Sequence, residues 1–222
     1  MNLEDYNIGA GLNKKVYVKL IEILDNYDND KVIRVLEFGS GMSSKFFIDY
    51  QRIYNKKLEL VSFDDSKEWC YKKRSVEEDK VLKLHIRNLI MCKDNDYNYQ
   101  IENKIINKKM FFKNILKTTW RQRNCFYDIL DTDIEGLFDI VILDGPNGNG
   151  RNLAYNYIRE HLNKDAIILI DDFDAREGDY DYEFVNILKY NYDVEEIYKY
   201  DSDLMDNYEE GGKFIFFKFI IY

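Results

Sequence analysis

The sequence contains a single proline, Pro146, and only three cysteines among its 222 residues. Cys70, Cys92 and Cys125 are odd in number and form no Cys-x-x-Cys pair, which argues against a disulfide framework and against a cysteine zinc site. No apolar run approaches the roughly 18 residues that a membrane-spanning helix needs. The chain also does not open with a basic stretch followed by an apolar one. We therefore expect a soluble, cytoplasmic protein without a membrane partner.

An excess of positive charge is also missing. The chain has 32 lysines and arginines against 41 acidic residues, a net charge of −9. A surface that neutralises nucleic-acid phosphates needs the opposite balance, so we expect no nucleic-acid partner. Hydrophobic residues still make up 45% of the chain, which is enough apolar surface for a sizeable core. This length predicts one domain, residues 1–222.

Short apolar runs alternate with amphipathic segments along most of the chain. The expected strands are 32–38, 58–63, 81–86, 138–146, 166–173, 192–200 and 211–222, and the expected helices are 13–27, 43–54, 66–78 (with Ser66 as N-cap), 151–162 and 182–190. This alternation predicts a parallel sheet with helices on both faces, and the last two runs predict an antiparallel hairpin. The expected fold is a Rossmann-like α/β fold whose mostly parallel sheet has seven strands and ends in a C-terminal β-hairpin.

Residues 87–124 interrupt this alternation. The segment is polar and charged, and only 110–120, "MFFKNILKTTW", has a helical pattern. We expect a variable insertion or lid between the third and fourth strands of the main sheet.

The end of the first strand carries the first candidate site. The stretch "VLEFGSGMSS" places Glu37, Gly39, Ser40, Gly41 and Ser43 where ligands bind in open α/β sheets, beyond the carboxyl ends of the strands. Glycines let the backbone approach a ligand closely, and a glutamate can accept hydrogen bonds from an amine. The alternative is an ordinary tight turn between a strand and a helix.

Asp64 and Asp65 follow the second strand, where an acidic side chain suits ribose hydroxyls. The alternative is a carboxylate favoured by the dipole at a helix start. The glycine turn lacks the third glycine of the dinucleotide pattern, because Ser44 stands at that position and Phe46 follows two residues later. A nucleoside without phosphates is therefore favoured over a pyrophosphate.

In this combination and order, the chain resembles the class I S-adenosylmethionine-dependent methyltransferases. "VLEFGSG" is similar to their first motif and "LVSFDDSKEW" to their second, and the resemblance covers about residues 31–222 except 87–124. It implies S-adenosylmethionine as cofactor and Asp64 as the residue that binds its ribose. Asp65 is the neighbour of Asp64 in this site. The residues implied for the methionine portion are Glu37, Gly39, Ser40 and Gly41, with Ser43 in the same loop.

A second set of acidic residues follows the fourth and fifth strands: Asp144 in "LDGPNGNGR", and Asp171 and Asp172 in "LIDDFD". Carboxylate oxygens suit a hard cation such as Mg²⁺, which would bind a substrate hydroxyl and lower its pKa. The spacing resembles that of metal-dependent O-methyltransferases of catechols and macrolide sugars, and "DGP" and "GR" resemble enzymes of saccharide modification. Gly145 and Pro146 depart from the antibiotic-sugar pattern, and no histidine base follows Asp144. The alternative is a metal-free site in which Asp172 only caps a helix.

The acceptor side is less defined. Arg151 has the planar fork that clamps a phosphate or uronate, although a solvated helix start is the alternative. The resemblance implies that the 87–124 segment shapes the acceptor pocket, with Tyr127 and Asp128 on its inner wall. His85 lies in an apolar strand and is expected in the core, with a general base as the alternative.

These patterns together predict methyl transfer from S-adenosylmethionine to an oxygen of a small molecule, a sugar or a nucleotide-linked sugar, with Asp144 as the catalytic residue. A cofactor-binding interaction protein without turnover and an aminopropyl transferase remain as alternatives.

Overall fold

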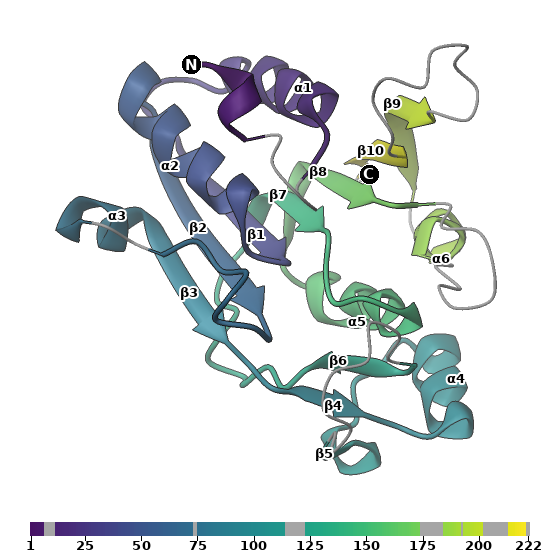
Figure 1. Ribbon diagram of the computed structural model, residues 1–222. Coiled ribbons are helices and arrows are strands. Elements are labelled where there is room, and N and C mark those ends of the chain that lie inside the picture. Colours follow the sequence, from purple (N-terminus) through teal and green to yellow (C-terminus); the bar gives the residue numbers. More distant parts are fainter. Residues whose placement is uncertain are drawn as a thin grey trace.

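The structure, a computed structural model, describes residues 1–6, 12–72, 75–113, 123–173, 184–191, 193–201 and 213–220. Its main sheet has seven strands in the order β3-β2-β1-β7-β8-β10-β9 (Figure 1). The strands are β1 (Val32–Phe38), β2 (Lys57–Asp64), β3 (Leu82–Ile86), β7 (Phe138–Leu143), β8 (Leu162–Asp171), β9 (Val194–Asp201) and β10 (Lys213–Phe219). Only β10 runs antiparallel to its neighbours, β8 and β9. This topology confirms the expected seven-stranded sheet with its closing hairpin.

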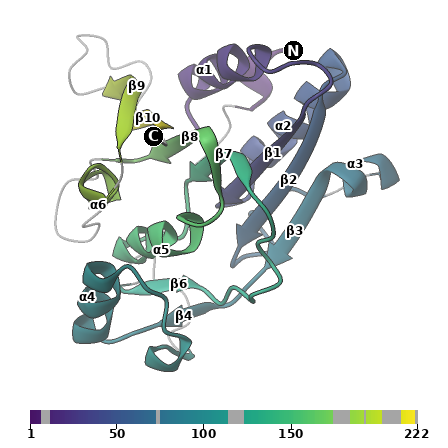
Figure 2. The ribbon, with the colours of Figure 1, turned by 180° about the vertical axis from the view of Figure 1, so that it is seen from behind.

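Helices cover both faces of this sheet, as the two opposite views show (Figures 1 and 2). On one face, α1 (Lys14–Asp25) and α2 (Met42–Tyr54) bury Val16, Leu20 and Phe46 against alternate residues of the central strands. On the other, α5 (Ala154–Ile158) and α6 (Phe184–Asn191) bury Ile158 and Leu188 in a second cluster. Two separate cores are the expected result of a sheet that is apolar on both sides.

The helix after β2 begins later than the sequence predicted. Helix α3 spans Val76–Val81, and its N-cap is Ser75, whose side chain accepts from the backbone N–H of Glu78. The Ser66 hydroxyl instead accepts from the N–H of Glu68 in a turn. The reciprocal bond from Ser75 N–H to the Glu78 side chain completes a capping box, so the later serine is the cap.

A short 3-10 helix, η1 (Leu3–Asp5), precedes α1. None of the described helices is long and apolar enough to cross a membrane.

The inserted segment forms a second, small antiparallel sheet in the order β5-β4-β6. Its elements are β4 (Leu89–Met91), α4 (Asp94–Asn103), the 3-10 helix η2 (Lys108–Met110), β5 (Phe112–Lys113) and β6 (Cys125–Tyr127). The helix expected at 110–120 is not found at 110–113, and residues 114–120 lie outside the described residues. Because β6 pairs with β4, this sheet extends to Tyr127, beyond the expected boundary at 124.

The insertion is attached to the 3-10 helix η3 (Asn149–Leu153), which follows β7. The side chain of Asn149 donates to Asn124 Oδ1 and accepts from the Asn124 backbone N–H, both at 2.7 Å. The Tyr97 hydroxyl donates to the Asn149 carbonyl oxygen at 3.0 Å. At Gly150 an added Cβ would lie 1.7 Å from the Cys125 carbonyl oxygen, so only glycine allows this approach. The insertion thereby supports the segment that leads away from Asp144.

Candidate functional site

The loop after β1 and the end of β7 touch through two glycines. Gly39 has a φ of +97°, and a Cβ there would lie 2.9 Å from the backbone carbon of Asp144. A Cβ at Gly145 would lie 2.9 Å from the Gly39 Cα. Both positions therefore require glycine, because any side chain would force the strand ends apart. This close contact brings the expected donor loop next to Asp144, the expected catalytic residue.

Backbone hydrogen bonds fix the shape of the same loop. Gly39 N–H donates to the Phe63 carbonyl at 2.9 Å, and Ser40 N–H donates to Asp64 Oδ2 at 3.0 Å. Asp64 Oδ1 accepts from the Ser66 N–H at 2.7 Å. Burial raises the pKa of Asp64 to about 6, and the bonds from Ser66 and Ser40 oppose the rise. Asp64 therefore lies beside the glycine loop and holds it, while its neighbour Asp65 is exposed.

Glu37 is fully buried beneath this loop, in a cage of serine hydroxyls. Its Oε2 accepts from Ser44 and from Ser62, whereas its Oε1 has no partner among the described residues. Burial raises the pKa of Glu37 to about 7, and the hydroxyls of Ser43, Ser44 and Ser62 act in the opposite direction. The orphaned Oε1 fits an incoming cation such as the ammonium group of S-adenosylmethionine. Sequence reasoning missed Ser44 and Ser62 as partners, although Ser62 is the register partner of Glu37 across β1 and β2.

Three carboxylates gather where β7 and β8 end. Asp144, Asp171 and Asp172 each offer an oxygen, and these oxygens lie within 4.8 Å of one another. Burial, then repulsion from Asp171, raises the pKa of Asp144 well above its usual range. Burial, then repulsion from Asp172, raises that of Asp171 to about 7. The structure thus brings together the three residues that the sequence proposed as a metal site.

These three carboxylates are the described residues that could hold a divalent cation. Mg²⁺ binds hard oxygen ligands at about 2.1 Å in an octahedron, so opposite ligands are about 4.2 Å apart. The oxygens of the cluster lie within 4.8 Å of one another, so side chains that hold Mg²⁺ would have to move slightly closer together. Asp172 has a φ of +52°, a left-handed conformation that aspartate tolerates better than most residues. A bound cation would offset the mutual repulsion of these side chains.

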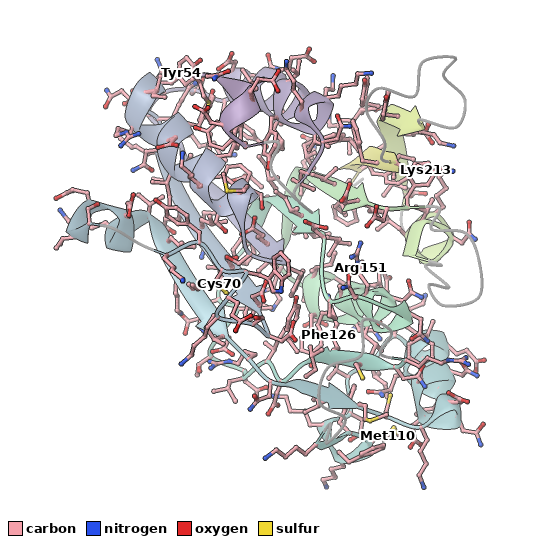
Figure 3. The ribbon with its side chains drawn as sticks, viewed as in Figure 1. Tyr54, Cys70, Met110, Phe126, Arg151 and Lys213 are labelled. Atoms are coloured by element: carbon pink, nitrogen blue, oxygen red, sulfur yellow. The ribbon has the colours of Figure 1, made fainter. Side chains whose placement is uncertain are left out.

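Arg151 has a different position from the one expected of a substrate clamp. Its side chain is 1% exposed and lies between η3 and the ends of β7 and β8 (Figure 3). The guanidinium donates to the carbonyl oxygens of Pro146 at 3.2 Å, Asp171 at 3.0 Å and Asp144 at 2.7 Å. Because its donors bind backbone carbonyls, Arg151 connects the two strand ends instead of presenting a fork to an acceptor. We assign it a positioning role.

Tyr127 and Asp128, which were expected to form the inner wall of the acceptor pocket, make other contacts in the structure. Tyr127 is 1% exposed, and its ring stacks on Phe38 with a centroid distance of 6.2 Å. Its hydroxyl lies 2.4 Å from the position that a Cβ at Gly145 would take. Tyr127 therefore packs against the end of β7 and does not line an open pocket. Asp128 is half-buried, and its N–H donates to the Asn88 carbonyl at 2.9 Å.

His85 is only partly buried, whereas the sequence placed it in the core, and it does not lie at this site. Its ring stacks on Phe63 at 4.9 Å, and its Nδ1 lies 3.3 Å from Asp133 Oδ1. It belongs to β3, which is three strands away from the β7 strand that carries Asp144. At about 4.8 Å per strand, the two residues lie on the order of 14 Å apart.

Tyr17 of α1 lies close enough to these carboxylates to be affected by their charge, and its position could not be predicted from the sequence. Its side chain is 0% exposed, and its hydroxyl has no partner among the described residues. Burial raises its pKa far above the usual range, and the charges of Asp144, Glu37 and Asp171 add to the effect. The sequence gave only a weak indication that Tyr17 is buried, because it lies three residues before Leu20 in an amphipathic helix.

No protein-family model matches the sequence, and no curated protein matches it either. Solved structures with the same fold exist. Precorrin-6y C5,15-methyltransferase from Geobacter metallireducens GS-15 aligns over 94% of this chain and 89% of its own, with 11% identity and a TM-score of 0.52. The CurJ carbon methyltransferase aligns over 93% of this chain and 54% of its own, with 11% identity and a TM-score of 0.50.

A more distant likeness is to an rRNA methylase from Streptococcus thermophilus. It has 11% identity, covers 94% of this chain and 96% of its own, and has a TM-score of 0.47. At such identities the likenesses show the fold alone. That fold is the Rossmann-like α/β fold that the sequence predicted, and it is shared with the precorrin-6y C5,15-methyltransferase and the CurJ methyltransferase.

Proposed function

We propose that this protein transfers a methyl group from S-adenosylmethionine to an oxygen of a sugar, a nucleotide-linked sugar or a related small molecule. One observation carries the proposal. The glycine loop that would hold the donor is in direct contact with Asp144, which belongs to a cluster of three carboxylates. A methyl donor and a site that activates a hydroxyl would therefore lie side by side.

The donor end of the site is assigned to residues of β1 and β2. Glu37 offers one unpartnered carboxylate oxygen for an ammonium group, and Gly39 and Gly41 keep side chains away from the ligand. Asp64 ends the neighbouring strand, where its carboxylate would accept from ribose hydroxyls while it continues to hold the Ser40 amide. S-adenosylmethionine, when bound, supplies an electrophilic methyl group.

The acceptor end is assigned to Asp144, Asp171 and Asp172. Asp144 would orient the acceptor hydroxyl and accept its proton, and burial raises the pKa of Asp144, which makes its carboxylate a stronger base. A divalent cation held by all three carboxylates would supply Lewis acidity to the same hydroxyl. Alignment of hydroxyl and methyl group is the remaining requirement, and the Gly39–Gly145 contact fixes the two halves of the site relative to one another.

The test is methyl transfer from radiolabelled S-adenosylmethionine to a panel of sugars, nucleotide-linked sugars, catechols and RNA. Product on a saccharide hydroxyl, lost in Asp144→Asn while donor binding persists, supports the proposal. Transfer to RNA alone would overturn the assigned acceptor class. Donor binding without transfer to any acceptor favours an interaction protein. Activity that persists after exhaustive EDTA treatment would exclude the cation but leave Asp144 as base.

A further inference from the structure

Tyr17 of α1 and Glu37 of β1 are buried residues that lie near one another, since the charge of Glu37 acts on the Tyr17 hydroxyl. Tyr17 Oη and Glu37 Oε1 are each shielded from solvent and lack a partner within the described part of the chain. A buried polar atom without a partner costs about 1–3 kcal/mol, so a native structure rarely keeps two of them close together without a use. The first is a hydrogen-bond donor and the second an acceptor.

Helix α1 brings Tyr17 to the carboxyl end of the sheet. Lys15, two residues earlier, lies with its Nζ 4.1 Å from the centre of the Tyr200 ring. Tyr200 pairs with Phe214, which pairs in turn with Asp171 at the end of β8. The first turns of α1 are therefore level with the strand ends. The Tyr17 ring is held there by Phe46 of α2, with a centroid distance of 4.9 Å.

The amides of the glycine loop are already occupied. Gly39 N–H binds the Phe63 carbonyl, Ser40 N–H binds Asp64, and Gly41 N–H lies 3.4 Å from Ser44 Oγ. An anion at this loop must therefore find its donors elsewhere. The first amides of α2, which have no partner within the helix, are one source, and the Tyr17 hydroxyl is the other.

We propose that the Tyr17 hydroxyl binds the carboxylate of the methyl donor's amino-acid group, while Glu37 binds the ammonium group of the same end. The inference rests on the proposed function, because it assumes S-adenosylmethionine as the donor. In the amino-acid group of S-adenosylmethionine, the ammonium and carboxylate groups are attached to one carbon. Glu37 as hydrogen-bond acceptor and Tyr17 as hydrogen-bond donor would therefore match both groups. Burial and three nearby carboxylates raise the pKa of Tyr17, so its hydroxyl keeps the proton that it would donate to the carboxylate of the ligand.

Calorimetry with three adenosyl ligands separates this role from others. S-adenosylhomocysteine carries both charged groups, decarboxylated S-adenosylmethionine lacks the carboxylate, and methylthioadenosine lacks both. Tyr17→Phe should weaken S-adenosylhomocysteine about tenfold to a hundredfold, the usual effect of a hydrogen bond to a charged group. It should leave the other two ligands within about twofold. Glu37→Gln should weaken the first two and spare methylthioadenosine.

The matched control is Tyr6→Phe. Tyr6 packs on Tyr17, with a centroid distance of 5.6 Å, but its hydroxyl donates to Asp49 at 2.7 Å and is therefore already used. This variant should bind all three ligands like the wild type. Tyr17→Phe should also melt no lower than the wild type without ligand, because the lost hydroxyl made no bond in the structure.

Unchanged S-adenosylhomocysteine binding by Tyr17→Phe, or equal weakening of all three ligands, would overturn the inference and leave the proposed function standing. Failure of the wild type to bind any of the three would overturn the proposed function itself.

Discussion

Arg151 donates a hydrogen bond of 2.7 Å from Nη2 to the backbone carbonyl oxygen of Asp144. The same guanidinium reaches the Asp171 carbonyl, so one buried cation connects the strand ends that carry two of the three clustered carboxylates. It also lowers the pKa values of both aspartates, against the stronger effect of burial. The geometry of the carboxylate cluster therefore depends on a residue that the sequence placed in the acceptor pocket.

Arg151→Lys should reduce kcat more than it weakens donor binding. The lysine keeps the charge but cannot reach three carbonyls at once, so buried acceptors lose their donors and stability falls by about 2–3 kcal/mol. The measurements are kcat, the donor Kd and chemical denaturation. Arg159→Lys is a suitable control, because that arginine lies at the exposed surface beside Glu160. Full activity and stability in Arg151→Lys would remove its positioning role.

Donor affinity should depend on the ionisation of Glu37. Its pKa of about 7 means that it is mostly protonated below that pH, and only the carboxylate attracts an ammonium group. The donor's amine keeps its proton in this range, since α-amino groups titrate near pH 8 or above. The Kd for S-adenosylhomocysteine should therefore fall about tenfold per unit as pH rises towards 7 and level off above it.

Glu37→Gln should remove that dependence and bind weakly at every pH. Without ligand, the folding stability depends on pH in the opposite direction. Burial raises the pKa of Glu37 from 4.5 to about 7 in the folded protein, so its contribution to the free energy of unfolding is fully present below pH 4.5 and is lost as pH rises through about 7. A pH-independent Kd in the wild type would show that Glu37 does not titrate with donor binding.

Gly39→Ala should abolish donor binding. The added Cβ would lie 2.9 Å from Asp144 backbone atoms, and alanine disfavours a φ of +97°. Both effects push the loop away from β7 and misplace the donor relative to the acceptor site. The measurement is calorimetric titration with S-adenosylhomocysteine, and circular dichroism of the same sample checks that the variant is folded. Wild-type donor affinity in a folded Gly39→Ala variant would contradict the close-contact explanation.

Asn149→Ala should separate catalysis from donor binding. It removes both 2.7 Å bonds between η3 and Asn124, and with them part of the attachment of the insertion. We expect a loss of about 1–3 kcal/mol in the free energy of unfolding and a lower kcat, because η3 leads from Asp144. The donor Kd should change little, since Glu37 and Gly39 lie on β1 and its loop. A large change in donor Kd with unchanged kcat would contradict this division.

The sequence predicted the parts of the site that lie at strand ends. Glu37, Asp64, Asp144 and Asp171 follow or end apolar strands, and parallel strands bring such positions to one edge of the sheet. The alternation of strands and helices similarly predicted the sheet and its closing hairpin. Both signals are local and periodic, which is why a single sequence carries them.

The contacts made by side chains could not be read from the chain. Arg151 and Tyr127 were expected to face an acceptor, but packing against backbone carbonyls and Gly145 buries both. Tyr17 had no motif at all, because its role depends on how α1 packs over strands that come later in the sequence. The small sheet was also missed, since its strands are too short to show a periodic pattern.

The central claim is that the loop at Gly39 and Glu37 binds S-adenosylmethionine, and titration calorimetry of the wild-type protein tests it most directly. We predict one-to-one binding of S-adenosylmethionine and S-adenosylhomocysteine, with no detectable binding of NAD, because Ser44 replaces the third glycine of a dinucleotide turn. Preferential binding of NAD, or no binding of either adenosyl ligand, would contradict the account.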